Sequence, residues 1–192
     1  MFEKLIEMDE QLLLWIQEKL RFDALTPFVK AITHSADGGA IMIIATLILM
    51  IIPKTRKLGF LCGAALVVNT LICNVILKNL VARVRPYEVV DGLKLIIGRQ
   101  NDWSFPSGHS SAGFSMSTVL FRETPRKIGI PVLIFALLIS LSRLYVGVHY
   151  PTDVICGIIL GALTGFFTCT VYHRAIAKNQ IRLHRAEPVT QK

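Results

Sequence analysis

The sequence predicts an all-α integral membrane protein, a bundle of five to six transmembrane helices with an amphipathic N-terminal helix. Two observations favour this fold class. Of the 192 residues, 53% are hydrophobic and only 18% are charged, whereas soluble domains average about 25% charged residues. The apolar residues also form long blocks, and a chain that crosses lipid several times must be helical because each segment has to satisfy its own backbone groups. This composition excludes a disordered chain, a coiled coil, a collagen and a disulfide-rich secreted module.

Five apolar blocks are expected to cross the membrane. The second and the last approach the length of about twenty residues that spans a bilayer, and the first reaches that length with its flanking residues. The blocks are residues 36–52, 58–77, 108–121, 128–141 and 154–172.

The N-terminal third has mixed character and leaves two alternatives open. Residues 12–32 alternate apolar side chains with charged ones, so this stretch is either an interfacial amphipathic helix followed by a short membrane helix or a poorly hydrophobic sixth span. We assign residues 1–21 to an amphipathic segment. Acidic residues near the start, with no short apolar core before a small-residue site, argue against a cleavable signal peptide.

The chain is expected to form one membrane-embedded domain over residues 1–192, with no internal repeat. Basic residues fill the connectors at 54–57 and 122–127 and the tail at 174–192. The positive-inside rule places these three regions in the cytoplasm, including the tail, which is expected to fray.

The connector at residues 78–107 would then lie outside, although it is also basic. Binding of an anion would explain basic residues on the unfavoured side, and the alternative is a different topology. Its basic residues are Lys78, Arg83, Arg85, Lys94 and Arg99.

A first polar cluster combines Lys78 with Arg85 and Pro86. The preceding apolar helix is expected to run into this cluster and to end at the proline. A spacing of seven residues is two helical turns, so both basic side chains would share one face. Taken alone, such residues are more often anchors for lipid headgroups.

A second cluster follows at Pro106, Ser107, Gly108 and His109. Proline and small polar residues favour the start of a helix, where free backbone N–H groups and the positive end of the helix dipole bind anions. Glycine allows close approach to the backbone. The alternative is an ordinary capped span with an interfacial histidine.

A third cluster contains Arg143, His149 and Asp153. Four residues separate the histidine from the aspartate, so on one helical turn the carboxylate could accept a hydrogen bond from the imidazole. That bond would fix the tautomer and make the other ring nitrogen a better nucleophile. The alternative is a polar loop with a chance spacing.

Together the three clusters favour phosphoryl transfer. Three cations and a helix N-terminus suit a phosphate group, which arginine binds in a bidentate manner. Of the two histidines, one could attack phosphorus while the other protonates the leaving oxygen.

These blocks, in this order, resemble the type 2 phosphatidic acid phosphatase superfamily, which also includes vanadium haloperoxidases and glucose-6-phosphatase. The family pattern is K-x6-RP, then PSGH, then SR-x5-H-x3-D, and the chain matches every position between residues 78 and 153. Three blocks with fixed internal spacing are far more specific than any one of them.

The resemblance implies a role for each motif residue and requires neither a metal nor another cofactor. His149 would attack phosphorus and become a phosphohistidine, Asp153 would orient it, and His109 would protonate the leaving oxygen. Vanadate, a phosphate mimic, should inhibit. The phosphoryl oxygens would be held by Lys78, Arg85, Ser107, Gly108 and Arg143.

The expected partners are membrane lipids and a lipid phosphate substrate, not a nucleic acid. Small members with an extracytoplasmic site resemble undecaprenyl pyrophosphate phosphatases, and others cleave phosphatidylglycerol phosphate or phosphatidate. We expect the first activity, with the site on the outer side of the cell membrane. Haloperoxidases of the family are soluble, and a non-enzymatic anion transporter would not need the His149–Asp153 pair with a second histidine.

Overall fold

The computed structural model describes residues 2–186, and its regular structure is entirely helical, which confirms the predicted all-α class. The side chains described are those of residues 4–180. The elements in chain order are α1 (Phe2–Leu20), α2 (Thr26–Ser35), the 3₁₀ turn η1 (Asp37–Gly39), α3 (Ala40–Ile51), α4 (Arg56–Thr70), the π-helical η2 (Leu71–Leu77), α5 (Lys78–Val81), α6 (Pro86–Val89), α7 (Gly108–Glu123), α8 (Arg126–Tyr145) and α9 (Pro151–Ala186).

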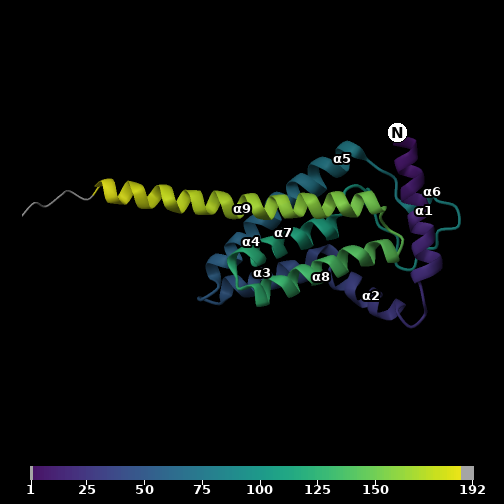
Figure 1. Ribbon diagram of the computed structural model, residues 1–192, viewed down its shortest axis with the longest axis horizontal. Coiled ribbons are helices and arrows are strands. Elements are labelled where there is room, and N and C mark those ends of the chain that lie inside the picture. The colour runs from purple at the N-terminus through teal and green to yellow at the C-terminus, as the bar shows by residue number, and fades with distance from the viewer. Residues whose placement is uncertain (1, 187–192) are drawn as a thin grey trace, which may run out of the picture.

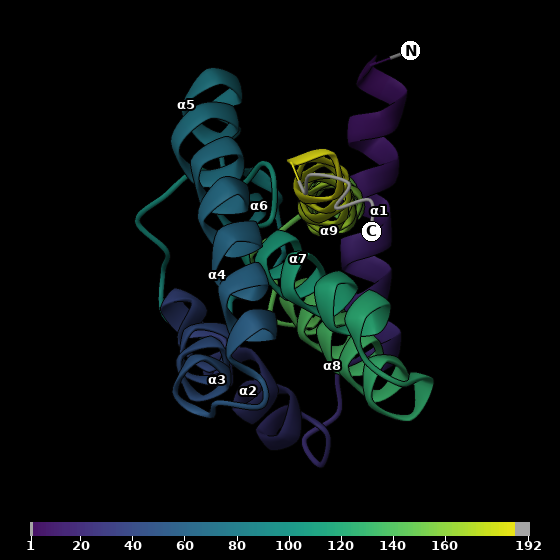
Figure 2. The ribbon, with the colours of Figure 1, turned by 90° about the vertical axis from the view of Figure 1, so that its left-hand side faces the viewer.

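The long helices run side by side, and α1 crosses one end of the bundle (Figure 1). Seen along the bundle, α7 occupies the middle and packs against α4, α8 and α9 (Figure 2). In the N-terminal third, α1 lies across the end of the bundle and a short helix, α2, comes next. Large apolar side chains of α1 remain exposed, including Leu12 and Trp15, as expected for an amphipathic helix at a membrane interface.

Three to four candidate membrane spans are present among the described residues, whereas the sequence predicted five to six. Three stretches meet the length and composition of a span. They are Arg56–Val89, which runs from α4 through α6, Arg126–Tyr145 and Pro151–Gln180. The pair Thr26–Ser35 and Asp37–Ile51, bent by 43°, would form a fourth as one broken span. The difference arises largely from α7, which has 16 residues and buries several serines against its neighbours.

A seam of small residues holds α7 against α9. A Cβ atom on Gly157 would lie 2.7 Å from the carbonyl oxygen of Ser107, and one on Gly165 would lie 2.5 Å from that of Ser115. Gly161, between them, approaches α7 more closely still. Glycines at this spacing let two membrane helices approach closely. The seam therefore fixes the N-terminus of α7 beside the N-terminus of α9.

The helix before the first polar cluster ends earlier than predicted. It stops at Val81, and Ala82 adopts the left-handed conformation with φ = +46°. Arg85 is extended, and Pro86 begins α6 instead of ending the preceding helix. Lys78 and Arg85 therefore do not share a helical face, and tertiary contacts must bring them together.

The basic regions gather at the end of the bundle opposite α1. The α3–α4 and α7–α8 connections and the distal part of α9 all lie there (Figure 1). Residues 174–186, where the sequence analysis expected a fraying tail, belong to α9, which continues without a break through Ala186. The rest of the predicted tail, residues 187–192, lies outside the described residues.

Candidate active site

All eight predicted site residues lie at the α1 end of the bundle, in segments that come together there. They are supplied by α5, the segment before α6, the N-terminus of α7, the last turn of α8, the α8–α9 loop and the first turn of α9. The residues are Lys78, Arg85, Ser107, Gly108, His109, Arg143, His149 and Asp153.

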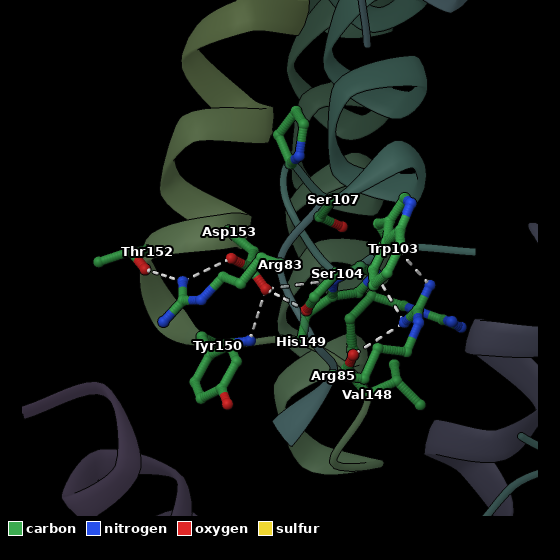
Figure 3. Close-up of polar contacts among 12 residues, drawn as sticks. Arg83, Arg85, Trp103, Ser104, Ser107, Val148, His149, Tyr150, Thr152 and Asp153 are labelled. Atoms are coloured by element: carbon green, nitrogen blue, oxygen red, sulfur yellow. Dashed lines mark hydrogen bonds and ion pairs between the residues drawn. The ribbon is translucent and has the colours of Figure 1, made fainter. Parts of the chain in front are cut away.

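His149 is fully buried in the α8–α9 loop. Its Nδ1 atom lies 3.5 Å from Oδ2 of Asp153, and its Nε2 atom lies 3.5 Å from Nη1 of Arg85 (Figure 3). The predicted contact with Asp153 is present, but not on one helical turn, because α9 begins only at Pro151. A turn at Gly147, with φ = +81°, precedes the histidine in this loop.

Asp153 is fully buried and accepts three further hydrogen bonds. Ser104 Oγ donates to Oδ2 at 2.5 Å, the Tyr150 amide donates to Oδ2 at 3.0 Å, and Arg83 Nη1 donates to Oδ1 at 2.7 Å (Figure 3). Arg83 also binds Asp9 of α1 at 2.8 Å. The carboxylate is thus fixed in orientation and paired with a cation. Its Oδ2 atom also faces the imidazole.

The surroundings of His149 favour its neutral form. Burial lowers the pKa of this imidazole, the neighbouring Asp153 carboxylate opposes that effect, and the charge of Arg85 reinforces it, which brings the pKa to about 3. Near neutral pH the ring therefore carries one proton. With that proton on Nδ1, toward Asp153, Nε2 presents a free lone pair toward Arg85.

Lys78 and Arg85 converge on one carboxylate, that of Asp102. Nζ of Lys78 pairs with Oδ2, and Nη2 of Arg85 pairs with Oδ1 at 2.6 Å. Burial alone would raise the pKa of Asp102, but the hydrogen bonds and charges of the two cations outweigh it and lower the pKa to about 2. Arg85 Nη1 also donates to the carbonyl of Val148 at 2.8 Å, beside the imidazole.

Arg143 is fully buried at the end of α8. Its Nη1 atom donates to Thr33 Oγ1 at 2.6 Å and lies 4.0 Å from Oδ1 of Asp37. Within the described part of the chain its Nε atom has no hydrogen-bond partner. A buried charged donor without a partner is costly, and an anion bound here would satisfy it.

His109 lies in the first turn of α7, with Nε2 3.4 Å from Asp37 Oδ1. The hydroxyl of Ser107 caps this helix by accepting hydrogen bonds from Ser110, at 3.4 Å from the amide and 2.9 Å from the hydroxyl. Gly108 lies close to the cations, since a Cβ atom there would be 3.8 Å from Lys78 Nζ.

A cavity of about 270 Å³ opens beside His109. Its lining combines polar residues, among them Lys78 and His109, with apolar ones, among them Met42, Ile43 and Leu66. The cavity can therefore accept a molecule that has an anionic group joined to a hydrocarbon chain.

Several residues of the site escaped the sequence analysis. Asp37 has a recognisable signal, because it is a charged residue inside the first predicted span, at its N-terminal end. Arg83 lies inside the first predicted cluster and Ser104 lies two residues before the second, but neither received a role in the mechanism. Asp102 and Asp9 offer no local signal, since an acid in a loop or on an amphipathic helix is ordinary.

Comparison with known proteins gives a consistent picture. Residues 57–177 match the PAP2 superfamily. An undecaprenyl-diphosphatase of Sulfolobus acidocaldarius is 33% identical over 126 residues, which cover 66% of this chain and 61% of that protein's length. A lipid A 4'-phosphatase of Bacteroides thetaiotaomicron is 28% identical over 94% of this chain and 84% of its own length.

A solved structure is similar over most of its length. The crystal structure of a transmembrane PAP2-type phosphatidylglycerolphosphate phosphatase from Bacillus subtilis has a TM-score of 0.72 and 26% sequence identity. The alignment covers 89% of this chain and 87% of that one.

Proposed function

Because the chain belongs to the PAP2 superfamily, we propose that it is a membrane lipid phosphatase that acts through a phosphohistidine on His149. The observation that carries this proposal is the placement of the imidazole. Its Nδ1 atom faces Asp153 and its Nε2 atom faces Arg85, each at 3.5 Å, in a fully buried position. A neutral imidazole with one oriented nitrogen and a guanidinium beside the other suits attack on a bound phosphoryl group.

The first step forms the phosphoenzyme. The Nε2 lone pair of His149 attacks phosphorus, and the bond from phosphorus to the leaving oxygen breaks. Protonated His109 gives its proton to that oxygen. Lys78, Arg85 and Arg143 stabilise the charge on the phosphoryl oxygens, and loss of one such donor typically costs about 2.7–4 kcal/mol of barrier.

The second step releases phosphate. Water attacks phosphorus, neutral His109 takes the proton of that water, and the bond between phosphorus and Nε2 breaks. His149 returns to its neutral form and His109 to its protonated form. Asp153 keeps the ring oriented in both steps. The backbone N–H of Gly108 at the start of α7 and the hydroxyl of Ser107 assist in holding the phosphoryl oxygens.

We propose a prenyl pyrophosphate, undecaprenyl pyrophosphate, as the substrate. The cavity beside His109 supports a hydrophobic leaving group, because Met42, Ile43 and Leu66 line it next to the general acid. The similarity to an undecaprenyl-diphosphatase adds to this choice. The second candidate is phosphatidylglycerol phosphate, favoured by the similarity to the B. subtilis phosphatidylglycerolphosphate phosphatase along nearly the whole chain.

We further propose that the single domain crosses the membrane five times, with the bent α2–α3 pair and α7 included. The enclosure of α7 by α4, α8 and α9 supports its crossing, because the longer helices shield its serines from lipid. Basic residues at the opposite end support an orientation with the site outside and the C-terminus in the cytoplasm. Reporter fusions after Lys57 and after Glu88 test this orientation, with the first expected inside and the second outside.

The activity is tested with purified wild-type protein in detergent. Phosphate release is measured from a long-chain prenyl pyrophosphate, phosphatidylglycerol phosphate and phosphatidate at equal surface concentration. The highest kcat/KM is expected for the pyrophosphate, and a higher value for phosphatidylglycerol phosphate would select the second candidate. EDTA is expected to leave the rate unchanged, since every group in the proposed steps is a side chain or a backbone amide. Absence of turnover on all three lipids would contradict the proposal.

A further inference from the structure

Asp102 occupies a position that the proposed reaction reserves for the substrate. One oxygen of its carboxylate pairs with Lys78 and the other pairs with Arg85. The Nε atom of Arg85 also donates to the backbone carbonyl of Asp102 at 2.8 Å. A bound phosphoryl group is expected to contact the same two cations through two of its oxygens, as the Asp102 carboxylate does here.

His149, the proposed nucleophile, is also inaccessible to a phosphoryl group in this arrangement. His149 is fully buried and Arg85 covers its Nε2 atom at 3.5 Å. The side chains of Lys78 and Arg85 are only 6% and 5% exposed, whereas that of Asp102 is 54% exposed. A phosphoryl group therefore cannot reach the histidine until a neighbouring side chain moves, and Asp102 is the member of this ion-paired group that faces outward.

Space for such a movement lies directly outside the ion pairs. A cavity of about 440 Å³ opens there, lined by Lys78, Arg85, Asp102 and Trp103, with amide side chains such as Asn101 around it. The aspartate belongs to the irregular part of the connector between α6 and α7, so its side chain can turn into this cavity without disturbing a helix.

We propose that the Asp102 carboxylate is an internal competitor of the substrate, which holds Lys78 and Arg85 in the resting enzyme and is displaced by a dianionic phosphoryl group. This inference rests on the proposed function of the same site. A phosphate dianion carries more charge than a carboxylate and displaces it, whereas a singly charged phosphodiester gains less from the exchange. Asp102 thereby selects dianionic oxyanions and weakens the hold on the product, inorganic phosphate.

The expected change in anion affinity depends on the fraction of time for which Asp102 occupies the two cations. If Asp102 holds the cations about nine-tenths of the time, the apparent affinity for an oxyanion is about tenfold weaker than that of the open site. Removing the charge of Asp102 should therefore tighten binding, whereas loss of a merely structural residue would weaken it.

The test compares wild type, Asp102→Asn and Asp91→Asn in detergent. The control removes one negative charge from an exposed residue of the same connector. Inhibition constants for orthovanadate and inorganic phosphate are measured, together with the rise in melting temperature that each anion produces. Asp102→Asn is expected to bind both anions about tenfold more tightly than wild type, and Asp91→Asn is expected to match wild type.

Each outcome decides one of the two proposals. Equal or weaker anion binding by Asp102→Asn, with a wild type that hydrolyses lipid phosphate, would overturn this inference alone. A wild type that neither hydrolyses lipid phosphate nor binds vanadate would overturn the proposed function. Recovery of folded Asp102→Asn only in phosphate or vanadate would support the inference, because the anion then replaces the carboxylate. A variant that stays unfolded with saturating anion present would show that Asp102 is structural.

Discussion

The two histidines of the site lie in contrasting surroundings. His149 is fully buried beside Asp153, a carboxylate that itself accepts hydrogen bonds from Ser104, Tyr150 and Arg83. His109 keeps 16% of its side chain exposed and lies 3.4 Å from Asp37, whose side chain is half exposed. One imidazole is therefore held from several directions, while the other faces a cavity and has one carboxylate near it.

This difference fits two different tasks. A nucleophile has to approach phosphorus along one direction, so a fixed ring reduces the entropy lost in reaching the transition state. A general acid must follow leaving groups of differing shape, which a partly exposed ring beside a cavity can do. His149, on the α8–α9 loop, is thus held in a fixed orientation, whereas His109, on α7, can adjust to the leaving group.

The largest effect is expected from His149→Asn. Removal of the attacking nitrogen should lower kcat by at least about 10⁴-fold on every lipid phosphate, as for nucleophiles of other covalent enzymes. Phosphate release and trapping of an acid-labile phosphoenzyme are the measurements. Substantial turnover by this variant would refute the assignment of the nucleophile.

His109→Gln should produce a loss that depends on the leaving group. General acids contribute about 10²–10⁴-fold, and the need for a proton is greater for an alkoxide than for a phosphate. We expect the full loss on phosphatidate and a clearly smaller one on prenyl pyrophosphate. The ratio of kcat values for the two lipids checks this, and an equal loss on both would remove His109 from the acid role.

Arg83→Gln should impair the orientation of His149, although Arg83 itself does not contact the substrate. Asp153 would lose a charged donor and Asp9 of α1 its cationic partner. The imidazole would then be less well oriented, and kcat should fall about tenfold with little change in KM. Arg99→Gln is the matched control, since this exposed arginine forms an ion pair with Glu88 and lies over the ring of Tyr87. A rise in KM without loss of kcat would contradict a positioning role.

The smallest expected effect is on the pH dependence of thermal stability. The folded-state pKa of His149 lies near 3, below its unfolded value of about 6.5, so the unfolded chain takes up a proton first. The contribution of this residue is present above pH about 6.5 and is lost as the pH falls toward about 3, with a slope of at most about 1.4 kcal/mol per pH unit. Melting temperatures of wild type should therefore fall more steeply over this range than those of His149→Asn. Parallel curves would show that the buried ring is not held neutral.

Much of the architecture could be predicted from local pattern. The apolar blocks indicated helices because lipid leaves the backbone no other partner, and the amphipathic segment before them is observed as α1. The placement of His149 beside Asp153 was expected as well, although the local geometry is different, with the histidine in a loop and the aspartate in the first turn of α9.

The remaining features depend on contacts between distant segments. Asp102 pairs with Lys78 across 24 residues and Asp9 pairs with Arg83 across 74 residues, and no local pattern contains such distances. The number of candidate spans also depends on packing, because α7 is short and rich in serine and becomes a central helix only inside its neighbours.

The sequence by itself determined the helical class, the basic end of the bundle and the residue types available for phosphate chemistry, since these follow from composition and short spacing. Tertiary structure alone decided which carboxylate meets which cation. Ion pairs between segments form only when close helix packing, here the glycines of α9 against the serines of α7, brings their ends together.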